Sequence, residues 1–153
     1  MNPRQVVSFV LHLYWRLFRP KSFGVKAIIM HPDNPDLCLV VQHNYGNQFA
    51  WNLPGGGYQP AHESPEQAII RELREELGVV ATVKLRLDDY YTDAQGKRDT
   101  VSLFICTTDT LAFSLNHELK VVAWHSMAKI ANDKAYYRIV RYAIGLCLAS
   151  PRP

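Results

Sequence analysis

Residues 55–80 read GGGYQPAHESPEQAIIRELREELGVV, and they carry the clearest structural signals of the chain. Its second half predicts a helix over 66–77, because apolar residues recur there at helical spacing. Ser64 is placed to cap the amino end of that helix, and Pro65 suits the first helical position. Gln67 completes a capping box, and the glycine after the helix is a natural stop. These signals predict one amphipathic helix shortly after a glycine turn.

Three glutamates, Glu72, Glu75 and Glu76, occupy one sector of this predicted helix beside its apolar stripe. Like charges at these spacings disfavour an exposed helix by roughly 0.2 to 0.5 kcal/mol per pair, so the cluster does not help the helix form. For a helix alone, a solvated acidic face partly neutralised by arginines is the simpler explanation. The glycines at 55–57 favour a different explanation, because a glycine turn brings backbone carbonyls close to a ligand. Carboxylate and carbonyl oxygens together suit Mg²⁺ or Mn²⁺ shared with substrate phosphates.

The same stretch resembles the signature of the MutT-like Nudix hydrolases, G-x5-E-x7-R-E-U-x-E-E-x-G-U, in which U is a bulky apolar residue. Every fixed position of that pattern matches. The matching residues are Gly57, Glu63, Arg71, Glu72, Leu73, Glu75, Glu76, Gly78 and Val79. The resemblance implies an α/β fold, an α/β/α sandwich with a mixed β-sheet, preceded here by an N-terminal helix.

The resemblance also implies an activity, the cleavage of the diphosphate of a nucleoside diphosphate linked to another group by metal-activated water. The implied ligands of Mg²⁺, or of Mn²⁺ as its substitute, are the carbonyl of Gly56 and the carboxylates of Glu72, Glu75 and Glu76. Arg71 and Glu63 are expected to orient those glutamates, because groups behind the ligands tune metal sites. Glu72, Glu75, Arg71 and Glu63 are therefore the expected catalytic set.

The general base is left open by the resemblance. Glu72 is our preferred carboxylate for polarising or deprotonating the water, and a pure ligand role fits it equally. Some family members place the base on a later loop, just before a tryptophan in the last strand, but here Ala123 precedes Trp124. Glu118 is the nearest acidic substitute, and the role of an ordinary surface residue fits it equally.

Aromatic residues around the glycine turn are candidates for stacking on a nucleobase, although core packing explains each of them alone. The predicted substrate-binding residues are Tyr45, Trp51, Tyr58 and Arg98. Outside the signature, no residue selects among nucleoside triphosphates, nucleotide sugars or ADP-ribose, and capped or triphosphorylated RNA 5′ ends; binding to other nucleic acid is not expected. The alternative function is a non-catalytic nucleotide-binding sensor, held at a membrane by the amino-terminal segment.

That amino-terminal segment differs from the remainder of the chain. Five basic residues precede the first acidic residue, Asp33, in a chain whose formal net charge is only +3. The apolar run over 6–18 predicts a helix that Pro20 ends, and it is short of the roughly 20 residues needed to span a bilayer. No small-residue cleavage site follows it, so a cytoplasmic protein is expected. We divide the chain into an N-terminal helix, 1–21, and a Nudix hydrolase domain, 22–149.

Aromatic and basic side chains are mixed in this predicted helix, as in helices that lie on membrane surfaces. Docking on the body of the protein, or in the contact of a homodimer, is the preferred explanation, with membrane contact as the alternative.

The remaining residues predict a sheet and a closing helix. With 48% hydrophobic and 20% charged residues, the 153-residue chain has the composition of one folded domain. Predicted strands cover 24–30, 37–42, 51–53, 83–91, 100–107 and 119–124. A second helix is predicted from about Lys134 to Ala149, with Asp133 as its cap. Cys38, Cys106 and Cys147 lie in apolar runs and are expected in the core.

Overall fold

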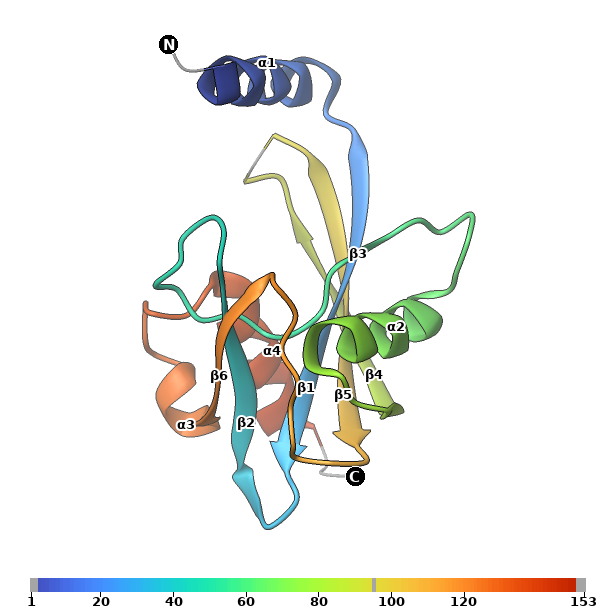
Figure 1. Ribbon diagram of the computed structural model, residues 1–153, viewed down its shortest axis with the longest axis vertical. Coiled ribbons are helices and arrows are strands. Elements are labelled where there is room, and N and C mark those ends of the chain that lie inside the picture. Colours follow the sequence, from blue (N-terminus) through green and yellow to red (C-terminus); the bar gives the residue numbers. More distant parts are fainter. Residues whose placement is uncertain (1–2, 95, 151–153) are drawn as a thin grey trace.

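A mixed β-sheet forms the centre of the computed structural model, which describes residues 3–94 and 96–150 (Figure 1). The strands are β1 (Lys21–His31), β2 (Asn34–His43), β3 (Gly57–Tyr58), β4 (Ala81–Thr92), β5 (Arg98–Thr108) and β6 (Leu119–Ser126). Their order is β4-β5-β1-β2-β6, and β3 pairs with β1 beside this path. Strands β1 and β5 run parallel, whereas the other pairs are antiparallel.

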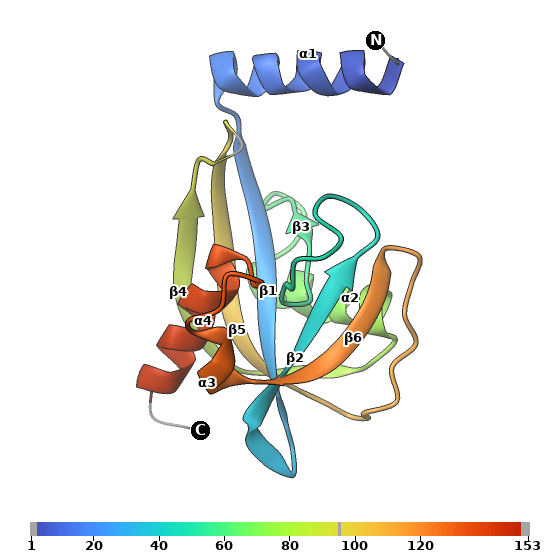
Figure 2. The ribbon, with the colours of Figure 1, turned by 90° about the vertical axis from the view of Figure 1, so that its left-hand side faces the viewer.

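The described residues form the helices α1 (Pro3–Phe18), α2 (Pro65–Leu77), α3 (Met127–Ile130) and α4 (Arg138–Ala149), of which the last three cover the faces of this sheet. Helix α2 packs on one face, and α3 and α4 pack on the other (Figures 1 and 2). The arrangement confirms the predicted α/β/α sandwich with a mixed sheet and an N-terminal helix.

Alternation along β1 separates two cores. Val25 and Ala27 pack with the apolar side of α2, and Ile28 packs with α4, because successive side chains of a strand point to opposite faces. The cysteines are buried as predicted: Cys106 lies in the α2 core, while Cys38 and Cys147 lie in the α4 core.

The local signals of α2 act as the sequence predicts. The Ser64 hydroxyl accepts a hydrogen bond from the Gln67 amide at 3.2 Å, and the Gln67 side chain accepts one from the Ser64 amide at 2.9 Å. Gly78 ends the helix with φ of 69° and donates its amide to the Arg74 carbonyl. Helix α2 therefore starts and stops at positions that its own residues define.

Strands β1 and β2 diverge toward one end of the sheet, and residues 52–58 lie between them (Figure 2). Asn52 pairs with β2 through two backbone hydrogen bonds to Val41, both 2.8 Å long. Further along, β1 donates backbone amides to the carbonyls of Pro54, at 3.0 Å, and Gly56, at 2.9 Å. The glycine turn is thus fixed inside the sheet rather than left as a surface loop.

The closing helix begins later than predicted. Asp133 does not cap it, and α4 starts only at Arg138. Trp51 is the cause, because its amide donates to the Ala135 carbonyl and its carbonyl accepts from the Tyr137 amide. These contacts hold Tyr136 in a bridge with Trp51 and keep Tyr137 in a non-helical conformation, with ψ of 151°. The predicted strand 51–53 correspondingly forms only two isolated bridges.

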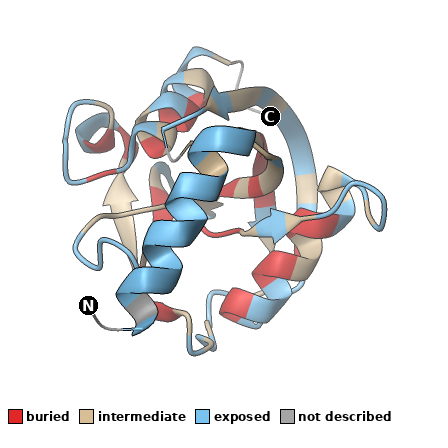
Figure 3. Ribbon diagram, turned by 90° about the horizontal axis from the view of Figure 1, so that it is seen from above, coloured by how far each residue is buried: buried red, intermediate tan, exposed pale blue. Residues whose placement is uncertain are grey.

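Helix α1 lies across the end of the β4–β5 hairpin, away from the two cores (Figures 1 and 2). The preferred expectation is that α1 docks on the body of the protein or in a homodimer contact. Its apolar side does not pack on the body, since every valine, leucine, phenylalanine and tyrosine of α1 is exposed (Figure 3). The homodimer contact stays a prediction. Among the described residues, no helix is long and apolar enough to cross a membrane.

Replacing Gly55 with alanine is expected to destabilise the fold. Gly55 has φ of 127°, and an added Cβ would lie 2.2 Å from the Val25 carbonyl oxygen. Because backbone blocks the methyl group, Gly55→Ala should lower the free energy of unfolding by more than about 3 kcal/mol in urea titrations. Gly145→Ala is the control, since Gly145 lies in α4 with open space around it and should gain up to about 1 kcal/mol. Equal stability of the two variants would contradict this account of the turn.

Candidate active site

Arg71 organises the acidic residues beside the glycine turn. Its guanidinium donates to the Glu63 carboxylate through Nε and Nη2, with a shortest distance of 2.6 Å. Nη1 donates to Glu72 at 2.8 Å and to Glu75 at 3.1 Å. Nη2 also reaches the Gly57 carbonyl at 3.2 Å, so one side chain ties α2 to the turn.

The glutamates differ in burial. Glu72 and Glu76 are buried, 9% and 2% exposed, whereas the side chain of Glu75 is 55% exposed. Burial raises the pKa of Glu72, against the opposing effect of Arg71. Hydrogen bonds from Arg71 lower the pKa of Glu63. Arg71 therefore favours the charged form of the Glu72 carboxylate, which burial disfavours.

Gly56 lies directly against the Glu72 carboxylate. A Cβ on Gly56 would lie 2.5 Å from Glu72 Oε2. The neighbouring Gly55 amide donates to Glu76 Oε2 at 2.8 Å. The turn therefore contacts the buried carboxylates directly. The Gly56 carbonyl, which the resemblance assigns to the metal, accepts from the Val25 amide and keeps its second lone pair.

Lys26 and His43 also lie at this site, although the sequence patterns do not predict a role for either residue. The Lys26 ammonium donates to the carbonyls of Leu53, at 2.9 Å, and Gly55, at 2.7 Å. Burial lowers the pKa of Lys26, and the charges of Glu76 and Glu72 oppose that shift. A lysine inside the apolar strand GVKAIIM was the one available signal.

His43 lies at the end of β2, with its Nε2 atom 3.6 Å from Glu76 Oε1. The side chain is buried, and Nε2 has no hydrogen-bond partner among the residues that the structure describes. The sequence gives no signal for His43, because His43 and Glu76 are far apart in the chain and come together only in the folded protein.

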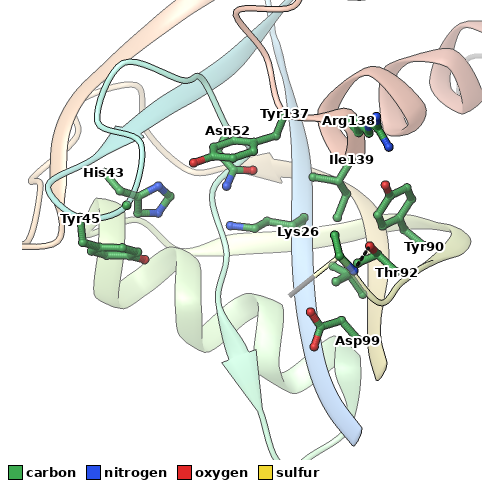
Figure 4. A pocket seen from close by; sticks show the side chains of 13 residues that line it. Lys26, His43, Tyr45, Asn52, Tyr90, Thr92, Asp99, Tyr137, Arg138 and Ile139 are labelled. Atoms are coloured by element: carbon green, nitrogen blue, oxygen red, sulfur yellow. Dashed lines mark hydrogen bonds between the residues drawn. The ribbon is translucent and has the colours of Figure 1, made fainter. Parts of the chain in front are cut away.

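A pocket of about 490 Å³ opens on the other side of the turn (Figure 4). The side chains around it come from β1, the loop after β2, the β4–β5 hairpin and the start of α4. They include those of Lys26, His43, Tyr45, Asn52, Tyr90, Asp99, Tyr137 and Arg138. Lys26 lies in the middle, with its amine directed toward His43 and Tyr45 (Figure 4). The pocket has the size and mixed aromatic and polar lining of a small-molecule site.

Of the four residues predicted to bind substrate, only Tyr45 lines this pocket. Trp51 packs against His125 instead, with ring centroids 4.4 Å apart. Tyr58 packs on Phe23 and the α2 core, on the opposite face of the sheet. Arg98 lies at the hairpin, where its Nε donates to the Arg19 carbonyl at 3.1 Å. A position near the turn in the sequence does not determine on which face of the sheet a side chain lies.

Glu118, the substitute considered for a later base, lies in the loop just before β6, and the Ala123–Trp124 pair lies within β6. The Glu118 carbonyl accepts from the Asn44 amide at 2.8 Å, so Glu118 borders the loop that carries Tyr45. Ala123 pairs with Val40 in the sheet, and Trp124 packs at the edge of the α2 core.

Comparison with known proteins decides the family. A sequence pattern of the NUDIX domain matches residues 20–143. The chain belongs to the Nudix family. Nudix hydrolases act on phosphoric anhydride bonds, and membership places this chain among such enzymes.

Similar proteins include several hydrolases. An ADP-ribose pyrophosphatase of Mycobacterium tuberculosis H37Rv is 36% identical over 149 residues, covering 87% of this chain and 72% of that relative. An RNA pyrophosphohydrolase of Cellvibrio japonicus is 40% identical over 103 residues, covering 67% of this chain but only 49% of that relative. The crystal structure of a MutT protein from Methanosarcina mazei Go1 shares the fold, with TM-score 0.72 and 21% identity over 83% of this chain and 92% of that one.

Nudix hydrolases generally use divalent metals, and the residues around this turn fit such an ion by charge and donor type. The acidic side chains are those of Glu63, Glu72, Glu75 and Glu76, and the cationic ones are those of Arg71 and Lys26. The formal excess is two negative charges on hard oxygen donors, which suits Mg²⁺ or Mn²⁺.

In this structure the carboxylates of Glu72, Glu75 and Glu76 do not surround a common point. Among the described residues, no three acidic, histidine or cysteine side chains are gathered closely enough to hold a metal ion. Glu75 is held on the exposed side of α2 by Arg71, apart from the buried pair Glu72 and Glu76. The charge of the site is therefore balanced in part by Arg71 in this structure.

Removing the Arg71 guanidinium is expected to destabilise the protein. Arg71→Met leaves the buried Glu72 carboxylate without its cationic partner, which should lower the free energy of unfolding by about 2 kcal/mol. The measurement is urea denaturation near neutral pH. Arg74→Met is the matched control, because Arg74 is exposed on the same helix and its loss should cost less than about 0.5 kcal/mol. A similar loss in both variants would show that Arg71 has no special role.

Proposed function

We propose that this Nudix chain hydrolyses the diphosphate of a nucleotide-type small molecule with the help of a divalent cation. One observation carries the proposal. The same glycine turn has buried carboxylates on one side and a pocket of nucleotide-compatible lining on the other, with Lys26 and His43 between them. A diphosphate lying across the turn would have its two ends in these two environments.

Glu72, Glu75 and Glu76, with the Gly56 carbonyl, are the residues that would hold Mg²⁺ or Mn²⁺. When bound, the cation lowers the pKa of water and neutralises charge that grows on the phosphate oxygens. Glu72 and Glu76 are already placed at the turn, and the exposed Glu75 side chain has room to reorient. Glu72, with its raised pKa, is our proposal for the carboxylate that takes a proton from water.

Other residues position these groups. Arg71 fixes the orientation of Glu72, and Glu63 in turn fixes Arg71 through two hydrogen-bonding atoms. The Lys26 ammonium and the unpaired Nε2 of His43 both line the pocket, where they can contact the oxygens of the diphosphate. Their burial strengthens such contacts, because water screens charge poorly there.

The nucleoside is proposed to lie in the pocket. Tyr45, Tyr137 and Tyr90 supply aromatic surface for a base or ribose, and Arg138 supplies an exposed cation at the rim. The pocket volume of about 490 Å³ suits one nucleoside rather than a longer oligonucleotide.

ADP-ribose and nucleotide sugars are the first substrates to test. The relative that matches the larger share of this chain is named an ADP-ribose pyrophosphatase. Triphosphorylated RNA ends are the second candidate, because the Cellvibrio japonicus relative is named an RNA pyrophosphohydrolase. An RNA 5′ end would place its first nucleotide in the same pocket.

Loss of a buried carboxylate should abolish turnover. Glu76→Gln keeps the shape of the side chain but removes charge from the cation site, so turnover should fall at least about a hundredfold. The assay measures phosphate released with Mg²⁺ or Mn²⁺ from ADP-ribose, nucleotide sugars, nucleoside triphosphates, dinucleoside polyphosphates and 5′-triphosphorylated RNA. For ADP-ribose, nucleotide sugars and dinucleoside polyphosphates, whose internal phosphates a phosphatase does not attack, a phosphatase is added to detect the products with terminal phosphates. For nucleoside triphosphates and triphosphorylated RNA, which a phosphatase would attack directly, inorganic pyrophosphatase is added instead.

Glu66→Gln is the matched control, because Glu66 is exposed in the first turn of the same helix. Its turnover should stay within about twofold of that of the parent. Equal turnover of both variants on any substrate would refute the metal site. Binding of a nucleotide without turnover on the whole panel would support the non-catalytic sensor instead.

Arg138 is expected to affect substrate binding more than chemistry. Arg138→Gln removes a cation from the pocket rim, which should raise KM by about tenfold with little change in kcat. Lys134→Gln removes the same charge from an exposed residue outside the pocket lining and should leave KM unchanged. An unchanged KM in Arg138→Gln would place the nucleoside elsewhere.

A further inference from the structure

Helix α1 has its apolar side turned away from the protein. At about 100° per residue, its apolar residues share one arc of about 200°, and its polar residues share the remainder. Phe9, Leu13, Leu17 and Phe18 lie on this apolar arc and are 47–69% exposed. Such an outward-facing apolar surface is costly in water and indicates an occupant.

The other side of α1 is fixed to the β4–β5 hairpin. The Lys97 ammonium lies 3.7 Å from the centre of the Trp15 ring, and Arg19 forms an ion pair with Asp93 at 2.7 Å. Gly96 approaches the backbone of Trp15 and Arg16. The contacts set the rotation of α1 about its axis, with Trp15 on the side toward the hairpin. The apolar arc therefore faces outward.

Two features of the apolar surface argue against a second copy of the chain as its occupant. A pairwise helix contact uses a narrow seam, so two such helices would leave much of an arc of about 200° in water. The helix and the residues after it, up to Pro32, also carry basic side chains and no acidic ones. Two copies would bring like charges together.

We propose that α1 is an interfacial helix that docks the protein on an anionic lipid surface. A bilayer covers a broad apolar arc, and its phosphate groups complement the exposed basic side chains of Arg16 and Lys21. With 16 residues, α1 is about 24 Å long. This is shorter than the roughly 30 Å of a hydrocarbon core, and the apolar residues of α1 face one side only, so α1 would lie in the plane of the surface.

Docking by α1 would also place the pocket near the lipid. Thr92, Ala94 and Asp99 of the hairpin region line the pocket, and the same hairpin carries α1. The enzyme would thus work on nucleotides close to the membrane surface.

The test is flotation of the full chain with vesicles of phosphatidylcholine, with and without added phosphatidylglycerol. We expect binding to the anionic vesicles that weakens as salt is raised, because exposed charges are screened. Absence of binding to anionic vesicles at low salt would overturn the proposal.

Two double variants distinguish vesicle binding through the apolar arc from non-specific binding through other exposed apolar side chains. The double variant Leu13→Gln/Leu17→Gln should weaken vesicle binding by about tenfold or more, because both side chains would leave the lipid. Val80→Gln/Leu148→Gln is the matched control, since it removes two exposed apolar side chains, 54% and 46% exposed, outside α1. Circular dichroism checks that both variants keep their helices.

Equal vesicle binding by these two variants would overturn the proposal. Sedimentation velocity without vesicles provides the remaining test. A parent protein that is dimeric, fails to bind vesicles and becomes monomeric in Leu13→Gln/Leu17→Gln would assign the arc to a second copy instead. A parent that binds anionic vesicles and loses this binding in the same variant would support the lipid surface.

Discussion

The close approach of the Gly55 backbone to β1 is the constraint on which the site depends. Residues 52–58 enter the opening between β1 and β2, and they exchange backbone hydrogen bonds with both strands. No side chain fits at Gly55, because Val25 is only 2.2 Å from where its Cβ would be. The turn consequently contacts α2 on one face of the sheet and borders the pocket on the other. A substrate lying across the turn would therefore contact both.

Charge is the second constraint, because burying carboxylates beside one another is unfavourable without compensation. Arg71 supplies that compensation through hydrogen bonds to Glu63, Glu72 and Glu75. Lys26 adds a second cation from β1, held by carbonyls of the turn. The remaining negative charge is what makes the turn suited to a cation and its phosphate ligand. One set of interactions thereby serves both the fold and the proposed activity.

Helix α1 differs from the rest of the protein in where its apolar residues lie. The sheet and its helices bury their apolar residues in two cores, whereas α1 exposes its own and uses its polar side for the hairpin contact. Attachment through a cation and an aromatic ring leaves the apolar arc available. The hairpin therefore links the surface of α1 to the rim of the pocket.

The sequence by itself determined the features that depend on neighbouring residues. The caps of α2, five of the six predicted strands and the Nudix signature are local patterns, because capping bonds and side-chain periodicity join residues a few positions apart. Tertiary contacts alone delay α4 to Arg138 through the pairing of Trp51 with Tyr136, and they bring Lys26 and His43 to the glutamates. They also leave Trp51, Tyr58 and Arg98 outside the pocket. These outcomes rest on hydrogen bonds and faces shared by residues distant in the chain, and no local pattern records them.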